Sequence, residues 1–116
     1  MELKISVVMI GVTNMARAIR FYRHIVGLPL KFKTSAYSEF STCGAVLALE
    51  KRKRVTAIGP AFTIQTQNVK RDARRLRRHG VKFWKPLREE EFGWLFMPKD
   101  PEGNIFEIVQ YKRRRA

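Results

Sequence analysis

The residue best suited to chemistry is Glu107, which follows a turn and lies within a short apolar strand. Residues 100–104 (DPEGN) predict the turn, because Asp and Pro initiate turns while Gly and Asn tolerate positive φ angles. In the strand expected over residues 105–111 the side chains alternate, so Ile105, Glu107 and Val109 share one face. The spacing predicts one carboxylate between two apolar neighbours, a candidate acid/base group or metal ligand.

Two histidines, three consecutive glutamates and one cysteine are the other groups able to do chemistry. His24 and His79 lie near the expected ends of helices, where a positive imidazole complements the helix dipole, so we expect structural roles for both. The glutamates at residues 89–91 cannot converge on one point in an extended segment, so a solvated loop is expected there. The single Cys43 excludes an internal disulfide and a thiol-rich zinc site.

The chain is strongly basic, with 24 Lys and Arg against 10 Asp and Glu and a formal net charge of +14. This charge favours anionic partners, although a solvated basic surface is the simpler explanation. Weak, salt-sensitive nucleic-acid binding is one alternative. It would use residues 51–54, the basic tail, and arginines of the second predicted helix, namely Arg71, Arg74, Arg75, Arg77 and Arg78.

No secretion signal and no apolar run of membrane-spanning length is apparent in the sequence. We therefore expect a soluble cytoplasmic protein with no membrane partner.

The first half of the chain predicts a strand, a helix and three more strands. Residues 5–12 form a β-branched run typical of a strand, and Asn14 can cap a helix over residues 15–26. Gly27 ends this helix in a left-handed conformation. The three further strands are expected at residues 30–33, 37–41 and 45–49.

The same order restarts after Gly59 and Pro60. Residues 62–66 predict a strand, Asn68 caps a second helix, and Gly80 ends it. Strands are then expected at residues 81–84, 94–97 and 105–111.

The spacing from capping asparagine to terminating glycine is almost the same in both halves, since Asn14 to Gly27 and Asn68 to Gly80 differ by one residue. This agreement indicates an internal duplication. We therefore expect one domain over residues 1–116, with βαβββ halves at 1–55 and 60–112 and a basic tail at 113–116.

With these motifs in place, the sequence resembles the vicinal oxygen chelate superfamily, the glyoxalase/bleomycin-resistance/dioxygenase group, along nearly its whole length. The matching fragments in the first half are Val8-x-Ile10-x-Val12-Thr13-Asn14, Ala18-x-x-Phe21-Tyr22 and Gly27-Leu28. Those in the second half are Asn68-Val69, Gly80-Val81-Lys82-Phe83 and the DPEGN turn with Ile105-Phe106-Glu107. The resemblance implies an α+β fold of two tandem βαβββ units, whose curved mixed sheets form a cup.

The resemblance also implies four metal-ligand positions inside that cup, which in this chain are Val7, Ala48, Ala61 and Glu107. Only Glu107 can bind a metal, and one carboxylate cannot hold a catalytic ion against solvent. We therefore expect no cofactor, with a divalent metal as the alternative.

The main hypothesis is a mostly apolar cup that binds a small neutral or anionic organic molecule, in a protein that forms a homodimer. The expected ligand-contacting residues include Trp94, which follows a glycine where a strand begins at the cup. The full set is Val7, Met9, Ala48, Ala61, Trp94, Ile105, Glu107 and Val109.

Two alternatives remain open beside that hypothesis. One is a lyase, isomerase or dioxygenase that acts on a small oxygenated substrate, with Glu107 as metal ligand or as catalytic acid/base. The other is a basic nucleic-acid-binding or regulatory module.

Overall fold

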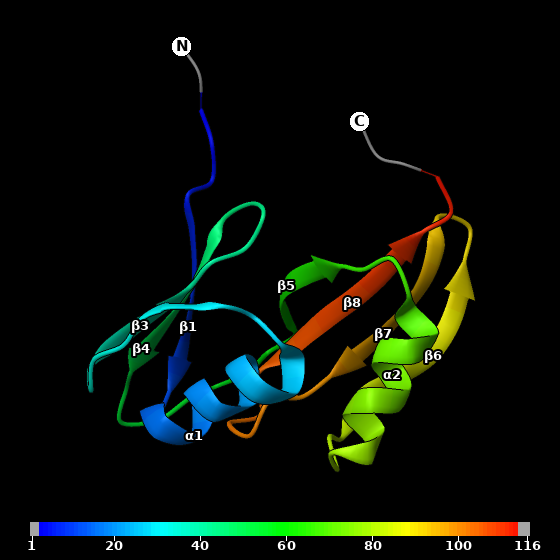
Figure 1. Ribbon diagram of the computed structural model, residues 1–116. Helices are drawn as coiled ribbons and strands as arrows, with labels where there is room; N and C mark the ends of the chain where they lie inside the picture. The colour runs from blue at the N-terminus through cyan, green and yellow to red at the C-terminus, as the bar shows by residue number, and fades with distance from the viewer. Residues whose placement is uncertain (1–2, 114–116) are drawn as a thin grey trace. The chain divides into compact units, whose positions relative to one another are not determined.

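The computed structural model describes residues 3–113 of the chain (Figure 1). It divides into two compact units, one up to Val55 and one from Thr56 onward, and each is described by itself. Of the basic tail expected at 113–116, residues 114–116 lie outside the described part.

Each unit contains a strand, a helix and three further strands, in the order expected from the sequence. The first unit comprises β1 (Val7–Val12), α1 (Met15–Arg20), the π-helical segment η1 (Phe21–Val26), β2 (Leu30–Phe32), β3 (Tyr37–Phe40) and β4 (Val46–Lys51). The second comprises β5 (Pro60–Gln65), α2 (Val69–Arg78), β6 (Phe83–Glu90), β7 (Gly93–Pro98) and β8 (Ile105–Tyr111).

The two sheets have the same topology. Their strand orders are β1-β4-β3-β2 and β5-β8-β7-β6. In each sheet the first and last strands of the unit pair in parallel, and the remaining pairs are antiparallel. The predicted α+β fold of two tandem βαβββ units is therefore confirmed.

Both helices begin at the predicted asparagine. The Asn14 side chain accepts a hydrogen bond from the Arg17 amide at 3.0 Å, and Asn68 accepts one from the Arg71 amide at 3.1 Å. These contacts satisfy a backbone donor that the first helical turn leaves without a partner.

The two helices end differently. In α2, the Gly80 amide donates to the Arg77 carbonyl and the Val81 amide to the Leu76 carbonyl, with Gly80 at φ 77°. This is a Schellman motif.

The expected single α-helix over residues 15–26 is wrong in its second half, where η1 follows α1. The amides of Gly27 and Leu28 both donate to the Tyr22 carbonyl, at 3.1 and 2.9 Å. A π-helical turn takes up one more residue than an α-helical turn, which matches the one-residue difference in cap spacing.

One face of each sheet packs against the helix of the same unit. In the first unit this face includes Phe40, Leu47 and Leu49, all buried, and α1 contacts β4. In the second unit it includes Phe96 and Phe106, which stack on Phe83 and Phe62 at ring distances of 4.8 and 5.2 Å. The core of each unit therefore lies between its helix and its sheet.

The expectation of a short strand at 81–84 is wrong, because β6 continues to Glu90, and of the solvated loop expected at 89–91 only Glu91 lies in a turn. The Glu89 carboxylate pairs with Lys112 at 2.6 Å, and Glu90 pairs with Arg88 at 3.0 Å. The strand continues to this point because its pairing with β7 extends to Glu90, which lies opposite Gly93.

Over residues 3–113, no helix has the length and apolar character that crossing a membrane requires.

Candidate functional site

Each sheet has a second face, opposite its helix, that we call the open face. Paired residues in neighbouring strands point to the same side of a sheet. In the first unit Met9 is paired with Ala48, and Ala48 with Glu39. Since Ile10 and Leu49 belong to the buried helix side, this row belongs to the open face.

The open face of the first unit exposes apolar side chains on its edge strand. Val7 and Met9 are 40% and 45% exposed, and Ala48 beside Met9 is fully buried. Phe32, paired with Glu39, is also exposed, and its ring centre lies 6.0 Å from that of Tyr37. The predicted residues Val7, Met9 and Ala48 therefore lie together on one face.

A polar group lies next to these apolar residues. The Tyr37 hydroxyl donates a 2.6 Å hydrogen bond to Glu39 Oε2, and Lys31 Nζ lies 3.5 Å from Glu39 Oε1. The hydrogen bond to Glu39 raises the pKa of Tyr37, with further contributions from burial and from the negative charges of Glu39 and Glu50. The phenol is therefore held as a neutral donor.

The pairing of Tyr37 with Glu39 was not predicted from the sequence. The signal was present, because two residues separated by one position in a strand share a face. The alternation of side chains along a strand could not show whether the face shared by Tyr37 and Glu39 is the open face or the helix side.

Gly11 is needed on the same face for a steric reason. A Cβ atom at this position would lie 2.6 Å from Cδ of Arg52, whose Nε is 2.9 Å from the Glu50 carboxylate. The missing side chain leaves room for Arg52 to cross β1 and pair with Glu50.

The open face of the second unit carries Glu107. Its partner in the parallel ladder is Thr63, whose hydroxyl donates to Glu107 Oε1 at 3.2 Å. Ile105 and Val109 lie two residues before and after Glu107 and share its face. They form a buried cluster with Leu95 and Met97. The carboxylate is thus half-buried beside an apolar cluster.

Trp94 does not join Glu107 on that face, which corrects the expected grouping. It pairs with Gln110, whose side-chain oxygen accepts a hydrogen bond from the Val69 amide at the start of α2. Trp94 therefore lies on the helix side of the sheet, where Lys112 Nζ is 5.4 Å from its ring centre.

Ala61 is exposed on β5, within the irregular pairing between Pro60 and Thr63. Thr63, rather than Ala61, is the direct neighbour of Glu107.

The sequence profile of the Glyoxalase/Bleomycin resistance protein/Dioxygenase superfamily matches residues 4–108. The chain belongs to this superfamily. Among curated proteins, no sequence matches the chain significantly.

Solved structures of the superfamily share the fold at low sequence identity. A glyoxalase family protein from Bacillus anthracis has a TM-score of 0.82 and 15% identity, over 97% of this chain and 98% of its own. TnmS3, an antibiotic binding protein from Streptomyces sp. CB03234, has a TM-score of 0.78 and 21% identity, over 96% and 98%. Lactoylglutathione lyase from Agrobacterium tumefaciens has a TM-score of 0.78 and 16% identity, over 94% of each chain.

The four metal-ligand positions that the family resemblance implies carry one donor side chain in this glyoxalase-superfamily chain. Of the four metal-ligand positions that the family resemblance implies, three carry Val7, Ala48 and Ala61, which have no donor atoms in their side chains. Within residues 3–113, no three His, Cys, Asp or Glu side chains are grouped as a metal would require. Glu107 is the one donor at these positions, and Thr63 already occupies one of its oxygens.

The arginine-rich helix α2 is partly neutralised within its own unit. Asp72 is buried, accepts a hydrogen bond from Thr66, and lies 3.4 Å from Arg71 and 4.0 Å from Arg75. Arg77 stacks over the Phe83 ring at 4.1 Å. Three of the five arginines considered for nucleic-acid binding therefore have intramolecular contacts.

Proposed function

We propose that this glyoxalase-superfamily protein binds a small neutral or anionic organic molecule on the open face of its sheets, without a divalent metal. The observation that carries the proposal is the open face of the first unit. There exposed Val7 and Met9 share one face with the hydrogen-bonded pair of Tyr37 and Glu39, and Ala48 lies between Met9 and Glu39.

The composition of this face supports ligand binding. Sites for small molecules are mostly apolar, with a few polar groups that orient the ligand. Val7, Met9 and Phe32 supply apolar surface, while Tyr37 and Glu39 supply an ordered hydroxyl and carboxylate. TnmS3, which shares the fold, is an antibiotic binding protein, and this supports small-molecule binding.

The charge of the chain supports a neutral or anionic ligand. With a formal net charge of +14, the surface potential repels cationic molecules and attracts anionic ones.

A screen by thermal shift, followed by calorimetry, tests the proposal directly. The panel would contain neutral and anionic aromatic compounds, antibiotics among them, each with and without EDTA. We expect at least one compound to stabilise the protein equally under both conditions, because no metal takes part in binding. Loss of all stabilisation on adding EDTA would contradict the proposal.

A pair of matched variants locates the site. Met9→Asp places a charge within the apolar strip and should weaken a hit by roughly tenfold or more, because burying an unpaired carboxylate is costly. Leu87→Asp is the control, since Leu87 is an exposed strand residue that lies beside α2, away from the open face. Equal losses in both variants would place the ligand elsewhere.

A second candidate is catalysis by Glu107 on a small oxygenated substrate. The observation that favours it is the hydrogen bond from Thr63, which holds the carboxylate in one orientation beside an apolar cluster. Turnover of a vicinal diol, ketoaldehyde or catechol that Glu107→Gln abolishes would support this candidate. A stoichiometric metal in the active protein would replace the main proposal by metal-dependent chemistry.

We also propose that the protein forms a homodimer, which sedimentation equilibrium tests.

Nucleic-acid binding through α2 is tested by its salt dependence, since phosphate contacts to a charged surface weaken steeply as salt increases.

A further inference from the structure

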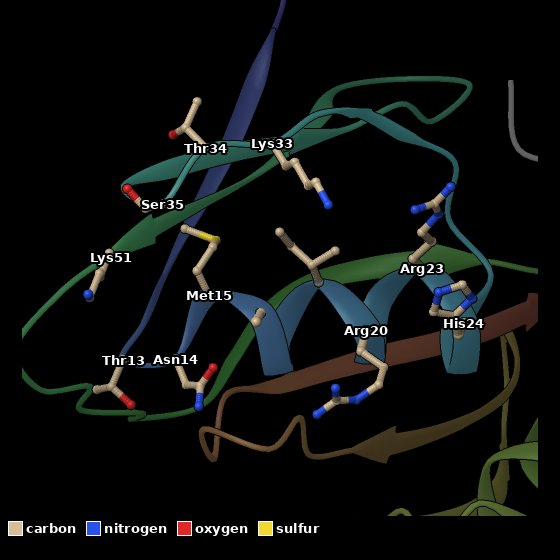
Figure 2. A pocket seen from close by; sticks show the side chains of 12 residues that line it. Thr13, Asn14, Met15, Arg20, Arg23, His24, Lys33, Thr34, Ser35 and Lys51 are labelled. Carbon is tan, nitrogen blue, oxygen red and sulfur yellow. The ribbon is translucent and has the colours of Figure 1, made fainter.

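A basic groove lies on the helix side of the first unit, opposite the open face. It has a volume of about 840 Å³ and lies between the helical segment and the turn that joins β2 to β3 (Figure 2). Its lining residues are Thr13, Asn14, Met15, Ala16, Ile19, Arg20, Arg23, His24, Lys33, Thr34, Ser35 and Lys51.

Four permanently charged basic residues line the groove, and no carboxylate does. Arg20, Arg23, Lys33 and Lys51 line it, and none of them pairs with an acidic residue in the described part of the chain. The basic residues that do have acidic partners lie elsewhere, such as Arg52 with Glu50. Like charges left together in a concave surface repel one another and strengthen the local positive potential.

The side chains are arranged to meet a ligand inside the groove. Figure 2 shows Lys33 and Met15 extending into the space between the β2–β3 turn and the helix, with Arg23 and His24 at one end. Arg20 points away from Lys33, out of this space. Met15, Ala16 and Ile19 provide an apolar floor beneath these charges.

We propose that this groove binds a small molecule that carries a phosphate group. Guanidinium and ammonium groups are the usual partners of phosphate, and the apolar floor would contact an organic body attached to it. The volume lies within the range of small-molecule sites, about 300–1,000 Å³. A nucleic acid would instead make phosphate contacts along a basic surface that includes residues outside this groove.

The proposal does not depend on the proposed function. The groove lies on the helix side of the first sheet, whereas Met9 lies on the open face. Met9→Asp should therefore leave phosphate binding unchanged.

Titration of the full chain with inorganic pyrophosphate and with AMP, followed by NMR, tests the site. We expect amide shifts confined to residues 13–24, 33–35 and 51 for both probes, and for AMP we expect additional contacts of its organic body with the apolar floor at Met15, Ala16 and Ile19. Shifts spread evenly over basic residues of both units would show attraction to net charge alone and overturn the proposal.

Two double variants separate the groove from general charge. Arg23→Gln with Lys33→Gln removes two charges from the groove and should weaken AMP binding about tenfold or more, since each is a charge-assisted contact. Arg54→Gln with Lys99→Gln removes the same charge from exposed positions outside the groove and should change binding less than about twofold, through screened long-range attraction only. Equal weakening by the two variants would overturn the proposal.

Titration with a single-stranded oligonucleotide distinguishes a nucleic acid from a small phosphate-bearing molecule as the ligand of the groove. Binding that tightens with oligonucleotide length and that the groove variant does not weaken would indicate a nucleic-acid surface and contradict a small-molecule site.

Discussion

The two units have the same strand order and the same asparagine caps, yet the space between helix and outer strand differs between them. In the first unit this space is the basic groove of about 840 Å³. In the second, the corresponding hollow between α2 and β6 is about 290 Å³. The duplicated backbone therefore does not determine where a ligand-sized space remains.

Side chains of the second unit account for the smaller hollow. Phe83 stacks on Phe96, Arg77 lies over Phe83, and Leu87 also lines the space. The first unit has a three-residue β2 followed by the polar turn of Lys33, Thr34 and Ser35, so no aromatic ring lines its groove.

The helices differ in charge as well as in packing. Four residues after each capping asparagine stands a buried residue, which is Ala18 in α1 and Asp72 in α2. Asp72 neutralises neighbouring arginines of α2, whereas Arg20 and Arg23 have no acidic partner among the described residues. The Asp72 carboxylate thus offsets part of the positive charge of α2, whereas no carboxylate lines the groove beside α1.

Removing a buried aromatic ring from each unit tests whether the two cores are equivalent. Phe40 in β3 and Phe96 in β7 occupy corresponding strands, and both are fully buried. Replacing either by Ala should cost about 3–5 kcal/mol of unfolding free energy, because a large cavity remains. Urea denaturation measures both values, with exposed Phe92→Ala as control. A cost below 1 kcal/mol, roughly that of a surface substitution, for one of them would show that the cores differ.

The next effect concerns the charge that only α2 neutralises internally. Asp72→Ala should lower the unfolding free energy by about 1–3 kcal/mol, since it leaves Thr66 and the arginines without their acceptor. Asp72→Asn keeps an acceptor for Thr66 and should cost less in the same urea denaturation. If the Ala variant matched the wild type, Asp72 would not be what balances this helix.

The helix ends provide a smaller test. Gly27 and Gly80 have φ angles of 96° and 77°, so Ala at either position should cost roughly 1–2 kcal/mol from left-handed strain. Thermal unfolding measures both. Similar losses would show that the π-helical and Schellman ends require glycine for the same reason, whereas a loss in Gly80→Ala alone would show that the π-helical end relaxes.

The smallest effect is on the ionisation of one phenol on the first open face. The Tyr37 pKa is raised chiefly by its hydrogen bond to Glu39, so Glu39→Gln should move its titration to lower pH. Ultraviolet absorbance of the phenolate follows the titration, and Tyr37→Phe identifies its contribution. An unchanged titration curve in Glu39→Gln would show that a hydrogen bond to a neutral side chain is enough to raise the Tyr37 pKa, and that the carboxylate charge of Glu39 is not required.

Local patterns predicted most of the fold. The caps at Asn14 and Asn68 and the ends at Gly27 and Gly80 were predictable, because capping depends on neighbouring backbone groups. The DPEGN turn was equally predictable. Asp100 accepts hydrogen bonds from the amides of Glu102 and Asn104 at 2.8 and 2.9 Å, and Gly103 has a φ of 89°.

Features of the candidate site were harder to predict where they depend on pairing between strands. Alternation placed Glu107 with Ile105 and Val109, but not the partner Thr63, which register alone selects. Trp94 was expected at the cup, yet its pairing with Gln110 turns it to the helix side.

The sequence by itself determined the order of elements, their caps and turns, and the one retained carboxylate, because each depends on residues close together in the chain. Tertiary structure decided the rest: which face of a sheet the helix covers, the continuation of β6 through Glu89 to Glu90, and the basic groove beside α1. These depend on strand register and on how residues distant in sequence fill space, which local spacing does not encode.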